Sequence, residues 1–420
     1  MSSDHEVHRG ITASSTTIIR GVFLVAISSA AALIGAAFKV IPEAPMQDSA
    51  PLMMPSESIE VSEKPQTKPV ELLQAIDFSS VLPSPPRHID FDNSTDTDHF
   101  LQFLTPIRDM DREYYTIRIN TYQRHAQLAL SVFHHLTCPG VAQIQIIWSE
   151  PGDPPPIIMN LMDNPKVVLE AHSDNSLNER FHILRPPLTL GILSMDDDVL
   201  TPCLAIDSAF FQWTLHPTTM VGFDARAHAV KKGEWFYRGD YQLQTLGYSM
   251  VLSRYCFLHR DYLHWYTTAM PSSIRKYVKQ KLNCEDLAMS MFVTKLSGGS
   301  RPILADEWAR WSQIELPSHN EISNKKRHRL ERRVCLNEFI DPLGVRHSMT
   351  LGPALGWNES YMDTVDLPNP RYQVVKQFWK SCQHLTGQEV NIKLRSFKGK
   401  LKQQHQAFLE AWNITELIKY

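Results

Sequence analysis

The sequence is poor in cysteine and has no large excess of charge of either sign. Its 420 residues include six cysteines, which form no CxxC pair and no clustered Cys/His pattern with metal-ligand spacing. A structural zinc site is therefore not expected. The formal net charge of -3 gives no global basic field of the kind that nucleic-acid binding needs. Nucleic acid is thus not an expected partner, and any anionic ligand must be held by a local site.

Internal repeats are also lacking, but there is enough material for a large core. Hydrophobic residues make up 43% of the chain. A chain of this length can form one large domain or two modest ones without needing disulfide bonds or structural metal ions for stability. This excludes the small-scaffold folds.

An uncharged apolar stretch lies near the N-terminus, at residues 21–38, between Arg20 and Lys39. As a helix rising about 1.5 Å per residue it would span roughly 27 Å, close to a thin bilayer core. A cleaved signal peptide and a buried soluble helix are the alternatives, and length and position favour a transmembrane signal anchor. The Asn-x-Ser/Thr sequons all follow this stretch, which suits a lumenal body behind a short cytoplasmic tail of residues 1–20. They begin at Asn93, Asn358 and Asn413.

The remaining chain divides into three parts. Residues 39–112 are expected to form a stem, because nine prolines between Pro42 and Pro86 and little hydrophobic periodicity do not support a packed core. A folded body is expected over residues 113–343. Residues 344–420 keep apolar and aromatic residues, with an amphipathic stretch at 404–418, and form an extension whose role the sequence does not indicate.

Within the body, apolar runs alternate with a helical pattern. Four strands are predicted, at residues 115–119, 143–148, 165–172 and 188–195, with a helix at 124–136. Such alternation is typical of βαβ units and a largely parallel sheet. Ligands of open α/β sheets bind beyond the carboxyl ends of the strands. The residues that follow these strands therefore belong to one candidate site.

Three adjacent carboxylates follow the fourth predicted strand. Asp196, Asp197 and Asp198 would repel one another unless a cation sits among them. Mn²⁺ and Mg²⁺ prefer oxygen ligands and usually share their coordination with substrate phosphates. The arrangement indicates a nucleotide-sugar diphosphate site, and a solvated acidic turn is the alternative.

Two polar segments follow other strands in the same way. Amides can recognise a uracil edge, and an arginine can hold a phosphate with two parallel hydrogen bonds. The alternatives are an ordinary turn before a helix and a polar βα loop. The side chains concerned are Asn175, Asn178, Arg180, Asn120 and Arg124.

A third group lies farther along the chain. Glu285 and Asp286, just after Asn283, precede an apolar run at helical spacing, where the helix dipole favours carboxylates for purely structural reasons. The functional alternative is a carboxylate that faces the anomeric carbon of a sugar. Arg332 lies in a basic run, residues 325–333, that is typical of a solvated helix face or a nucleic-acid or localisation patch.

Taken together, these residues resemble the C-terminal catalytic domain of the exostosin-like heparan-sulfate transferases, glycosyltransferase family 64. The shared features occur in the same order over residues 115–339. They are TYQR (121–124), IIW (146–148), NSLNERF (175–181), DDDV (196–199), GFDARAH (222–228), YSMVL (248–252), NCEDLAM (283–289) and RRVCLN (332–337). With only an anchor and a stem before this body, the chain is similar to the small single-domain members.

The resemblance implies a GT-A fold, an α/β sheet flanked by helices, and a Mn²⁺-dependent retaining transfer from a UDP-N-acetylhexosamine or related UDP-hexose. Nucleotide contacts are implied for some residues, with the three aspartates as a DXD-type motif in which Asp198 binds the metal. Asp286 matches the active-site carboxylate and Arg332 the arginine near the leaving diphosphate. A disulfide between Cys284 and Cys335 is also implied. The residues implied in donor binding are Asn120, Arg124, Asn175, Arg180, Asp196, Asp197 and Asn283.

The resemblance also implies where the protein works and on what. The expected location is the Golgi or endoplasmic reticulum membrane, as a single-pass type II protein with a lumenal catalytic domain and a glycan or glycolipid acceptor. The sequence leaves open whether the protein forms a homo-oligomer. The alternative function is that of a catalytically silent UDP-binding scaffold or chaperone. One departure concerns the donor: the family has asparagine after the tryptophan of the second strand, where this chain has Ser149 and Glu150.

Overall fold

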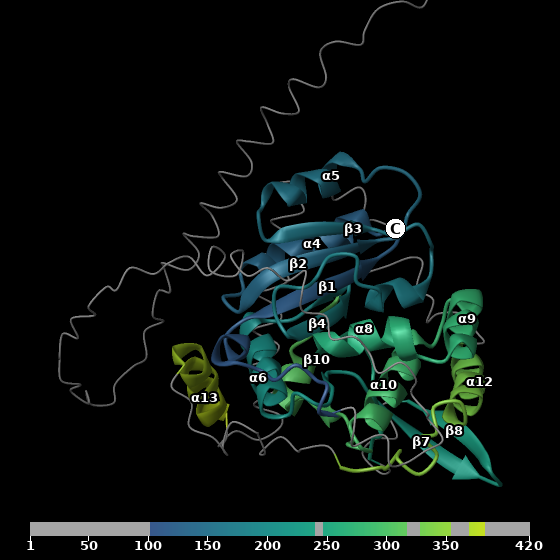
Figure 1. Cartoon of the computed structure of the whole chain (residues 1–420). Helices are drawn as coiled ribbons and strands as arrows, with labels where there is room; N and C mark the ends of the chain where they lie inside the picture. The colour runs from purple at the N-terminus through teal and green to yellow at the C-terminus, as the bar shows by residue number, and fades with distance from the viewer. Residues whose placement is uncertain (1–100, 240–246, 317–327, 354–368, 383–420) are drawn as a thin grey trace, which may run out of the picture. The chain divides into compact units, whose positions relative to one another are not determined.

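The computed structural model describes residues 101–239, 247–316, 328–353 and 369–382. At the centre of these residues is a seven-stranded sheet with the strand order β11-β6-β10-β4-β1-β2-β3 (Figure 1). β1 pairs in parallel with β2 and β4, β2 with β3, and β11 with β6, whereas β10 is antiparallel to both its neighbours. The expected mixed α/β fold with a largely parallel sheet is confirmed. The strands are β1 (Tyr115–Thr121), β2 (Val141–Trp148), β3 (Val167–Ala171), β4 (Gly191–Asp196), β6 (Val221–Gly222), β10 (Tyr255–His259) and β11 (Ile303–Leu304).

The predicted strands of the parallel half are present, with shifted ends. β4 begins at Gly191, three residues after the predicted start at Leu188. The register with its neighbours begins there, since Gly191 pairs with His259 of β10 and Ile192 pairs with Thr116 of β1. The predicted helix at 124–136 is α4, which begins one residue later.

Helices cover both faces of the sheet. Alternate residues of a strand point to opposite faces, and they join different hydrophobic clusters here. Ile192 of β4 packs with residues of α8, α10 and α12, whereas Leu193 packs with residues of α4 and α6. The sheet is therefore a buried middle layer. The helices are α4 (His125–Leu136), α5 (Pro156–Met159), α6 (Cys203–Leu215), α8 (Arg260–Ala269), α9 (Ser272–Lys281), α10 (Glu285–Leu296), α11 (Glu307–Trp311), α12 (His328–Ile340) and α13 (Pro370–Cys382).

Shorter elements frame the sheet. β5 (Val199–Leu200) pairs with β12 (Ile314–Glu315), and a three-stranded sheet has the order β8-β7-β9. Its strands are β7 (Ala225–Lys231), β8 (Glu234–Arg238) and β9 (Met250–Val251). Three short 3-10 helices are η3 (Asp109–Arg112), η4 (Asn160–Asp163) and η5 (Leu177–Phe181). β8 packs against α12, so this small sheet carries part of the wall described below.

The chain continues to pack on the body after Leu343. Val345 and Met349 are buried in the same cluster as α10 and α12. Tyr248 N donates to Gly352 O at 2.9 Å, and Gly352 N donates back to Tyr248 O at 3.1 Å. This pairing anchors residues 344–352 to the body.

The last described helix, α13, lies against α6 (Figure 1). The guanidinium of Arg371 is 3.2 Å from the buried carboxylate of Asp207. The hydroxyl of Tyr372 donates to the backbone oxygen of Arg112. Part of the C-terminal extension is thus integrated into the fold, and the amphipathic stretch at 404–418 lies outside the described residues.

Two disulfides cross-link the body. Cys284 is bonded to Cys335, the pair that the family resemblance implied, and Cys138 is bonded to Cys203, a pair that was not expected. The first joins the start of α10 to α12, and the second joins the end of α4 to the start of α6. Each closes a loop of more than fifty residues, with sequence separations of 51 and 65.

The expected membrane anchor, stem and sequons all lie outside the described residues. Among the residues that are described, no helix is both long and apolar enough to cross a bilayer. The anchor at 21–38 therefore stays a prediction.

Candidate functional site

A pocket of about 590 Å³ opens beyond the carboxyl ends of β1 and β4. Its other wall is formed by the starts of α10 and α12. Nine residues predicted from the sequence line it: Asn120, Arg124, Asn175, Arg180, Asp196, Asp198, Asn283, Asp286 and Arg332. The tenth, Asp197, lies behind the wall and is fully buried.

Strand register brings the first wall together. β1 lies between β2 and β4, and its parallel pairing with β4 sets Asn120 opposite Asp196. Parallel strands end at the same edge of a sheet, so the loop after β1 and the carboxylates after β4 meet there. The structure therefore brings these predicted residues together at one edge of the sheet.

Arg124 ties two of the three aspartates to this loop. Its guanidinium lies 2.9 Å from Asp197 Oδ1 and 2.5 Å from Asp198 Oδ2. The hydroxyl of Thr121 donates to Asp197 Oδ2 at 2.6 Å. Asp197 thus supports the wall, whereas Asp198 faces the pocket.

Burial and neighbouring arginines shift the pKa values of the three aspartates in different directions. Although Arg124 is close, burial raises the pKa of Asp197 to about 8. Burial and the charge of Asp196 also raise the pKa of Asp198. Burial acts in the same direction on Asp196, but Arg180, Arg254 and Arg124 outweigh it and lower its pKa.

These residues fit a hard divalent cation. Asp198 Oδ1 is buried and has no hydrogen-bond partner among the described residues, although it belongs to a side chain that lines the pocket. An unpaired buried carboxylate oxygen is costly. Oxygen atoms of this kind are the ligands that Mn²⁺ and Mg²⁺ prefer.

Arg180 lies between the two walls. It comes from η5, and its buried guanidinium pairs with Asp196 and lies 3.9 Å from Glu285 Oε1. It also donates to Ser253 O at 2.9 Å. These contacts hold Arg180 in the wall, where it fixes the position of the Asp196 carboxylate.

Asn178, singled out beside Arg180, points elsewhere. Its side chain donates to Arg275 O of α9 at 2.8 Å and accepts from the Tyr266 hydroxyl of α8 at 2.9 Å. It anchors η5 to the neighbouring helices. The Asn175 side chain, in contrast, lines the pocket.

The second wall carries a buried carboxylate–guanidinium pair. Arg332 Nη2 donates to Asp286 Oδ2 at 2.7 Å, and Asp286 Oδ1 accepts from Leu287 N at 2.7 Å. Arg332 Nε donates to His328 Nε2 at 2.8 Å, and its charge lies 5.5 Å from the centre of the Tyr237 ring. Contacts on both sides therefore fix the position of the pair.

Backbone conformation around the pocket is unusual. Gln123, Leu282 and Cys284 have φ values of 57°, 48° and 74°, in the left-handed region that side chains other than glycine rarely adopt. Such strain persists only where the surroundings enforce it, and it gathers at functional sites. Here the Cys284–Cys335 bond and the buried Asp286–Arg332 pair supply that constraint.

Positive charge predominates in the lining. Six arginines face five carboxylates, although the whole chain has a net charge of -3. The local excess fits an anionic ligand. The arginines are Arg124, Arg180, Arg226, Arg254, Arg329 and Arg332, and the carboxylates are Asp196, Asp198, Glu285, Asp286 and Glu315.

Several lining residues were not predicted. Arg254 and Tyr237 lie in or beside short strands, and no local pattern distinguishes them from ordinary surface residues. Arg226 lies in the GFDARAH motif, but no role at the site was assigned to it. Glu285 was visible at a predicted helix start. Burial, reinforced by the charge of Asp286, raises the pKa of Glu285 to about 7, which marks it as part of the site.

Comparison with known proteins agrees with the geometry. A family model described as the glycosyl transferase family 64 domain matches residues 115–352. An Arabidopsis thaliana protein named glycosylinositol phosphorylceramide mannosyl transferase 1 is 34% identical over 250 residues, which cover 56% of this chain and 73% of that protein.

Two longer relatives match a similar share of the chain. A Caenorhabditis elegans exostosin-like-3 homolog is 33% identical over 236 residues, which cover 56% of this chain and 28% of that protein. An Arabidopsis thaliana protein named glucosamine inositolphosphorylceramide transferase 1 is 29% identical over 237 residues, covering 55% of this chain and 30% of that protein. On these matches the chain belongs to the exostosin-like glycosyltransferase family 64.

Proposed function

We propose that this glycosyltransferase moves an N-acetylhexosamine or a related hexose from a UDP-sugar to a glycan or glycolipid acceptor, with retention of configuration and dependence on Mn²⁺. The observation that carries the proposal is one pocket in which Asp196 and Asp198, backed by the buried Asp197, face a buried Asp286–Arg332 pair. A diphosphate leaving group needs positive charge on one side and a reacting sugar needs a carboxylate on the other.

The first wall would bind the donor. Asn120 and Asn175 offer amides to a uracil or ribose edge, and Arg124 offers a guanidinium to phosphate once it is released from Asp198. Asp198, supported by Asp196, would hold the cation. When bound, Mn²⁺ supplies positive charge that neutralises the diphosphate.

The second wall would act on the reacting bond. As the sugar–phosphate bond breaks, negative charge grows on the diphosphate, and Arg332 is held where it can stabilise that charge. Positive charge grows on the sugar ring, and Asp286 provides the opposing carboxylate or orients the acceptor hydroxyl. Asn283 lies just before α10, with its amide donating to Glu331 at 3.2 Å.

The departure at Ser149 and Glu150 has a structural consequence. Glu150 Oε1 accepts from Gln123 N at 2.5 Å and lies 3.1 Å from His125 Nε2. The side chain thus holds Gln123 in its left-handed conformation, beside the expected nucleotide contacts.

We expect Glu150→Ala to weaken UDP binding by roughly three- to ten-fold, the equivalent of about 1 kcal/mol for one partly exposed charge-assisted hydrogen bond. The turnover number should change little, because Glu150 does not reach the Asp286–Arg332 pair. Glu150→Gln retains an acceptor oxygen and should restore most of the affinity. Calorimetry on the three proteins measures the effect, and equal affinities in all of them would remove Glu150 from the donor site.

The two disulfides provide a matched comparison. Removing either one, as Cys284→Ala with Cys335→Ala or as Cys138→Ala with Cys203→Ala, is expected to lower the free energy of unfolding by about 2–4 kcal/mol, since both loops are long. Only the first double variant loses the tether between the start of α10 and α12. It alone should lose most of its transfer activity at a temperature where both variants are folded. Equal activity in the two variants would show that the tether does not position Arg332.

The names of the relatives guide the choice of acceptors and donors to test. Two of the three reported relatives are named for inositol phosphorylceramides, which supports a glycolipid of that class as the first acceptor to test. One is named for mannose and one for glucosamine, so hexose and N-acetylhexosamine donors both belong in the screen. Glycan acceptors form the second group.

A secretory-pathway location, in the Golgi or endoplasmic reticulum membrane, belongs to the same proposal. Disulfides persist in oxidising compartments, and the two described here suit a lumenal body. Enzymatic removal of N-glycans from the sequons would reveal a lumenal orientation as a change in mass. An unglycosylated protein whose body is open to added protease in sealed vesicles would contradict it.

The experiment that tests the proposal combines binding with transfer. Calorimetry of UDP with and without Mn²⁺ is followed by UDP release from a donor panel, with and without acceptor. Metal-dependent binding with acceptor-dependent release supports the transferase. Binding with no release under any pairing favours a silent UDP-binding scaffold, and no UDP binding at all contradicts both.

A further inference from the structure

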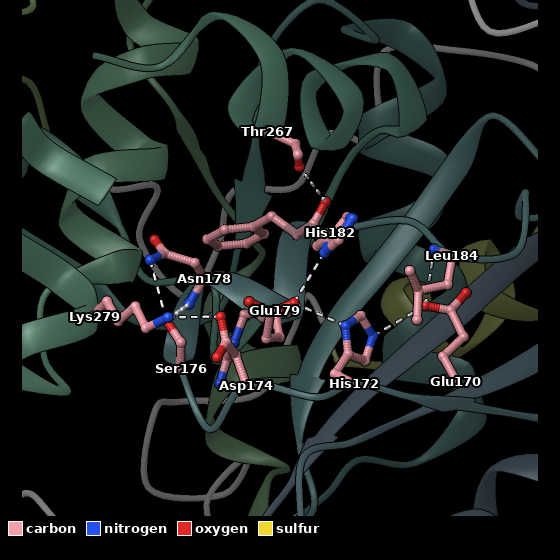
Figure 2. Close-up of polar contacts among 12 residues, drawn as sticks. Glu170, His172, Asp174, Ser176, Asn178, Glu179, His182, Leu184, Thr267 and Lys279 are labelled. Atoms are coloured by element: carbon pink, nitrogen blue, oxygen red, sulfur yellow. Dashed lines mark hydrogen bonds and ion pairs between the residues drawn. The ribbon is translucent and has the colours of Figure 1, made fainter. Parts of the chain in front are cut away.

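A second cluster of ligand-type side chains lies outside the pocket, on the segment that leads from β3 into η5. The Nδ1 atoms of His172 and His182 lie 2.8 and 2.9 Å from the same oxygen, Oε2 of Glu179 (Figure 2). Two imidazoles and a carboxylate therefore converge on one point. Nothing in the proposed transfer reaction uses these three side chains.

The two ring nitrogens of His172 have different surroundings. His172 Nε2 is buried, has no hydrogen-bond partner in the part of the chain that the structure describes, and lies 3.5 Å from Glu170 Oε2. Glu170 is itself fixed by Arg118, whose Nη2 is 3.0 Å from the same carboxylate oxygen. Metal-binding histidines commonly turn their second nitrogen toward a carboxylate in this way, and the proton on Nδ1, which now faces Glu179, would be released when the ion binds. His172 Nδ1 is thus oriented as a ligand.

We propose that His172, Glu179 and His182 bind a divalent transition-metal ion of borderline softness, for which Zn²⁺ is the probe. Imidazole nitrogens with one carboxylate are a common ligand set for this class of ion. The side chain of His182 is 42% exposed, so water can occupy the fourth position. No zinc site was expected from the cysteine spacing, and the ligands here include no cysteine.

The site requires only a small adjustment. In a tetrahedron with metal–ligand bonds of about 2.0 Å, neighbouring ligand atoms are roughly 3.3 Å apart, and the present separations are shorter. Because His182 is at the surface, its ring can rotate outward. The Glu179 carboxylate must also move about 0.5 Å away from His172 Nδ1, which now lies 2.8 Å from it. The three atoms then surround the ion.

The location gives the ion a role. Glu179 is adjacent to Arg180, and Asn175 lies on the same segment, and both Arg180 and Asn175 line the pocket. A metal that joins the end of β3 to η5 would hold that pocket-lining segment in place. The proposal does not depend on the sugar-transfer reaction, because binding of the ion can be measured without nucleotide.

The test uses the full chain, stripped of metal with a chelator and titrated with Co²⁺ and then Zn²⁺ in the absence of nucleotide. We expect one equivalent of Co²⁺ with the visible absorption of a tetrahedral site, displaced by Zn²⁺, and a rise in melting temperature with Zn²⁺. His182→Ala should lose this equivalent and the rise. His347→Ala, at an exposed histidine elsewhere, should retain both.

Two further variants separate this site from the pocket aspartates and from a folding defect. Asp198→Ala should still bind the equivalent of Co²⁺, because its carboxylate belongs to the pocket. Glu179→Gln preserves the size of the side chain and should lose the equivalent, which guards against misfolding in any one variant. Absence of Co²⁺ binding in the native chain, or undiminished binding in both His182→Ala and Glu179→Gln, would overturn the proposal and leave a hydrogen-bonded His–Glu–His network.

Discussion

Replacing Asp286 with asparagine is expected to lower the rate of sugar transfer by about 10²- to 10³-fold, the range seen when one electrostatic group of an active site is removed. Asparagine has nearly the same shape and can still accept the hydrogen bond from Leu287 N. What it lacks is the negative charge that opposes the developing positive charge on the sugar and that pairs with Arg332 at 2.7 Å. Affinity for UDP should stay within a few-fold, because the nucleotide contacts belong to the other wall.

Asp286→Asn requires both a rate and a binding measurement. UDP release in the presence of acceptor gives the rate, and calorimetry gives the affinity. Arg332 keeps His328 and Tyr237 as neighbours in the variant, and a melting curve checks that the fold survives. Asp153→Asn, at an exposed carboxylate away from the pocket, is the matched control. Full transfer activity in Asp286→Asn would show that this carboxylate does not act on the sugar.

Replacing Asp198 with alanine is expected to remove the dependence of UDP binding on Mn²⁺, so that affinities with and without the metal become equal. The variant loses the carboxylate whose Oδ1 is buried and, within the described ranges of the chain, has no hydrogen-bond partner. It also releases the Arg124 guanidinium that now lies 2.5 Å from Asp198. Affinity for UDP without metal should therefore be maintained or rise, which distinguishes loss of a metal ligand from general damage to the pocket.

Asp163→Ala, at an exposed position in η4, is the control for the loss of one carboxylate. Calorimetry with and without Mn²⁺ on the native protein and both variants decides the outcome. If Asp198→Ala retains the metal dependence of the native protein, the ion is bound by other residues and the proposed role of Asp198 is wrong.

The parallel half of the sheet was predictable because its signals are local. Apolar runs at strand length, separated by a helical pattern, identify β1, α4, β2 and β3 directly from sequence. The meeting of Asn120 with Asp196 follows from the rule that parallel strands end at one edge. The later strands β6, β10 and β11 were missed, since two of them have only two residues and β10 reverses direction.

The sequence indicated which residues line the pocket better than it indicated which of them contact one another. Family motifs identified nine lining residues, but they carried no information on which charges neutralise each other. Burial places Arg180 on Asp196 and places Asp197 behind the wall with Thr121 and Arg124. The Cys138–Cys203 bond was likewise invisible, because a pairing of cysteines depends on packing of α4 against α6, which no motif encodes.

Apart from the lining residues between Arg226 and Arg254, the two walls of the pocket come from separate stretches of the chain, which begin at Asn120 and at Leu282. Inherited changes in the nucleotide contacts can therefore arise in one stretch while the reacting pair in the other is preserved, so homologues could diverge in donor and share their chemistry. Arg180 is the exception, because its buried guanidinium lies beside Asp196 of one wall and Glu285 of the other. A change at Arg180 would require matching changes in both walls. This position therefore limits how independently the two walls can evolve.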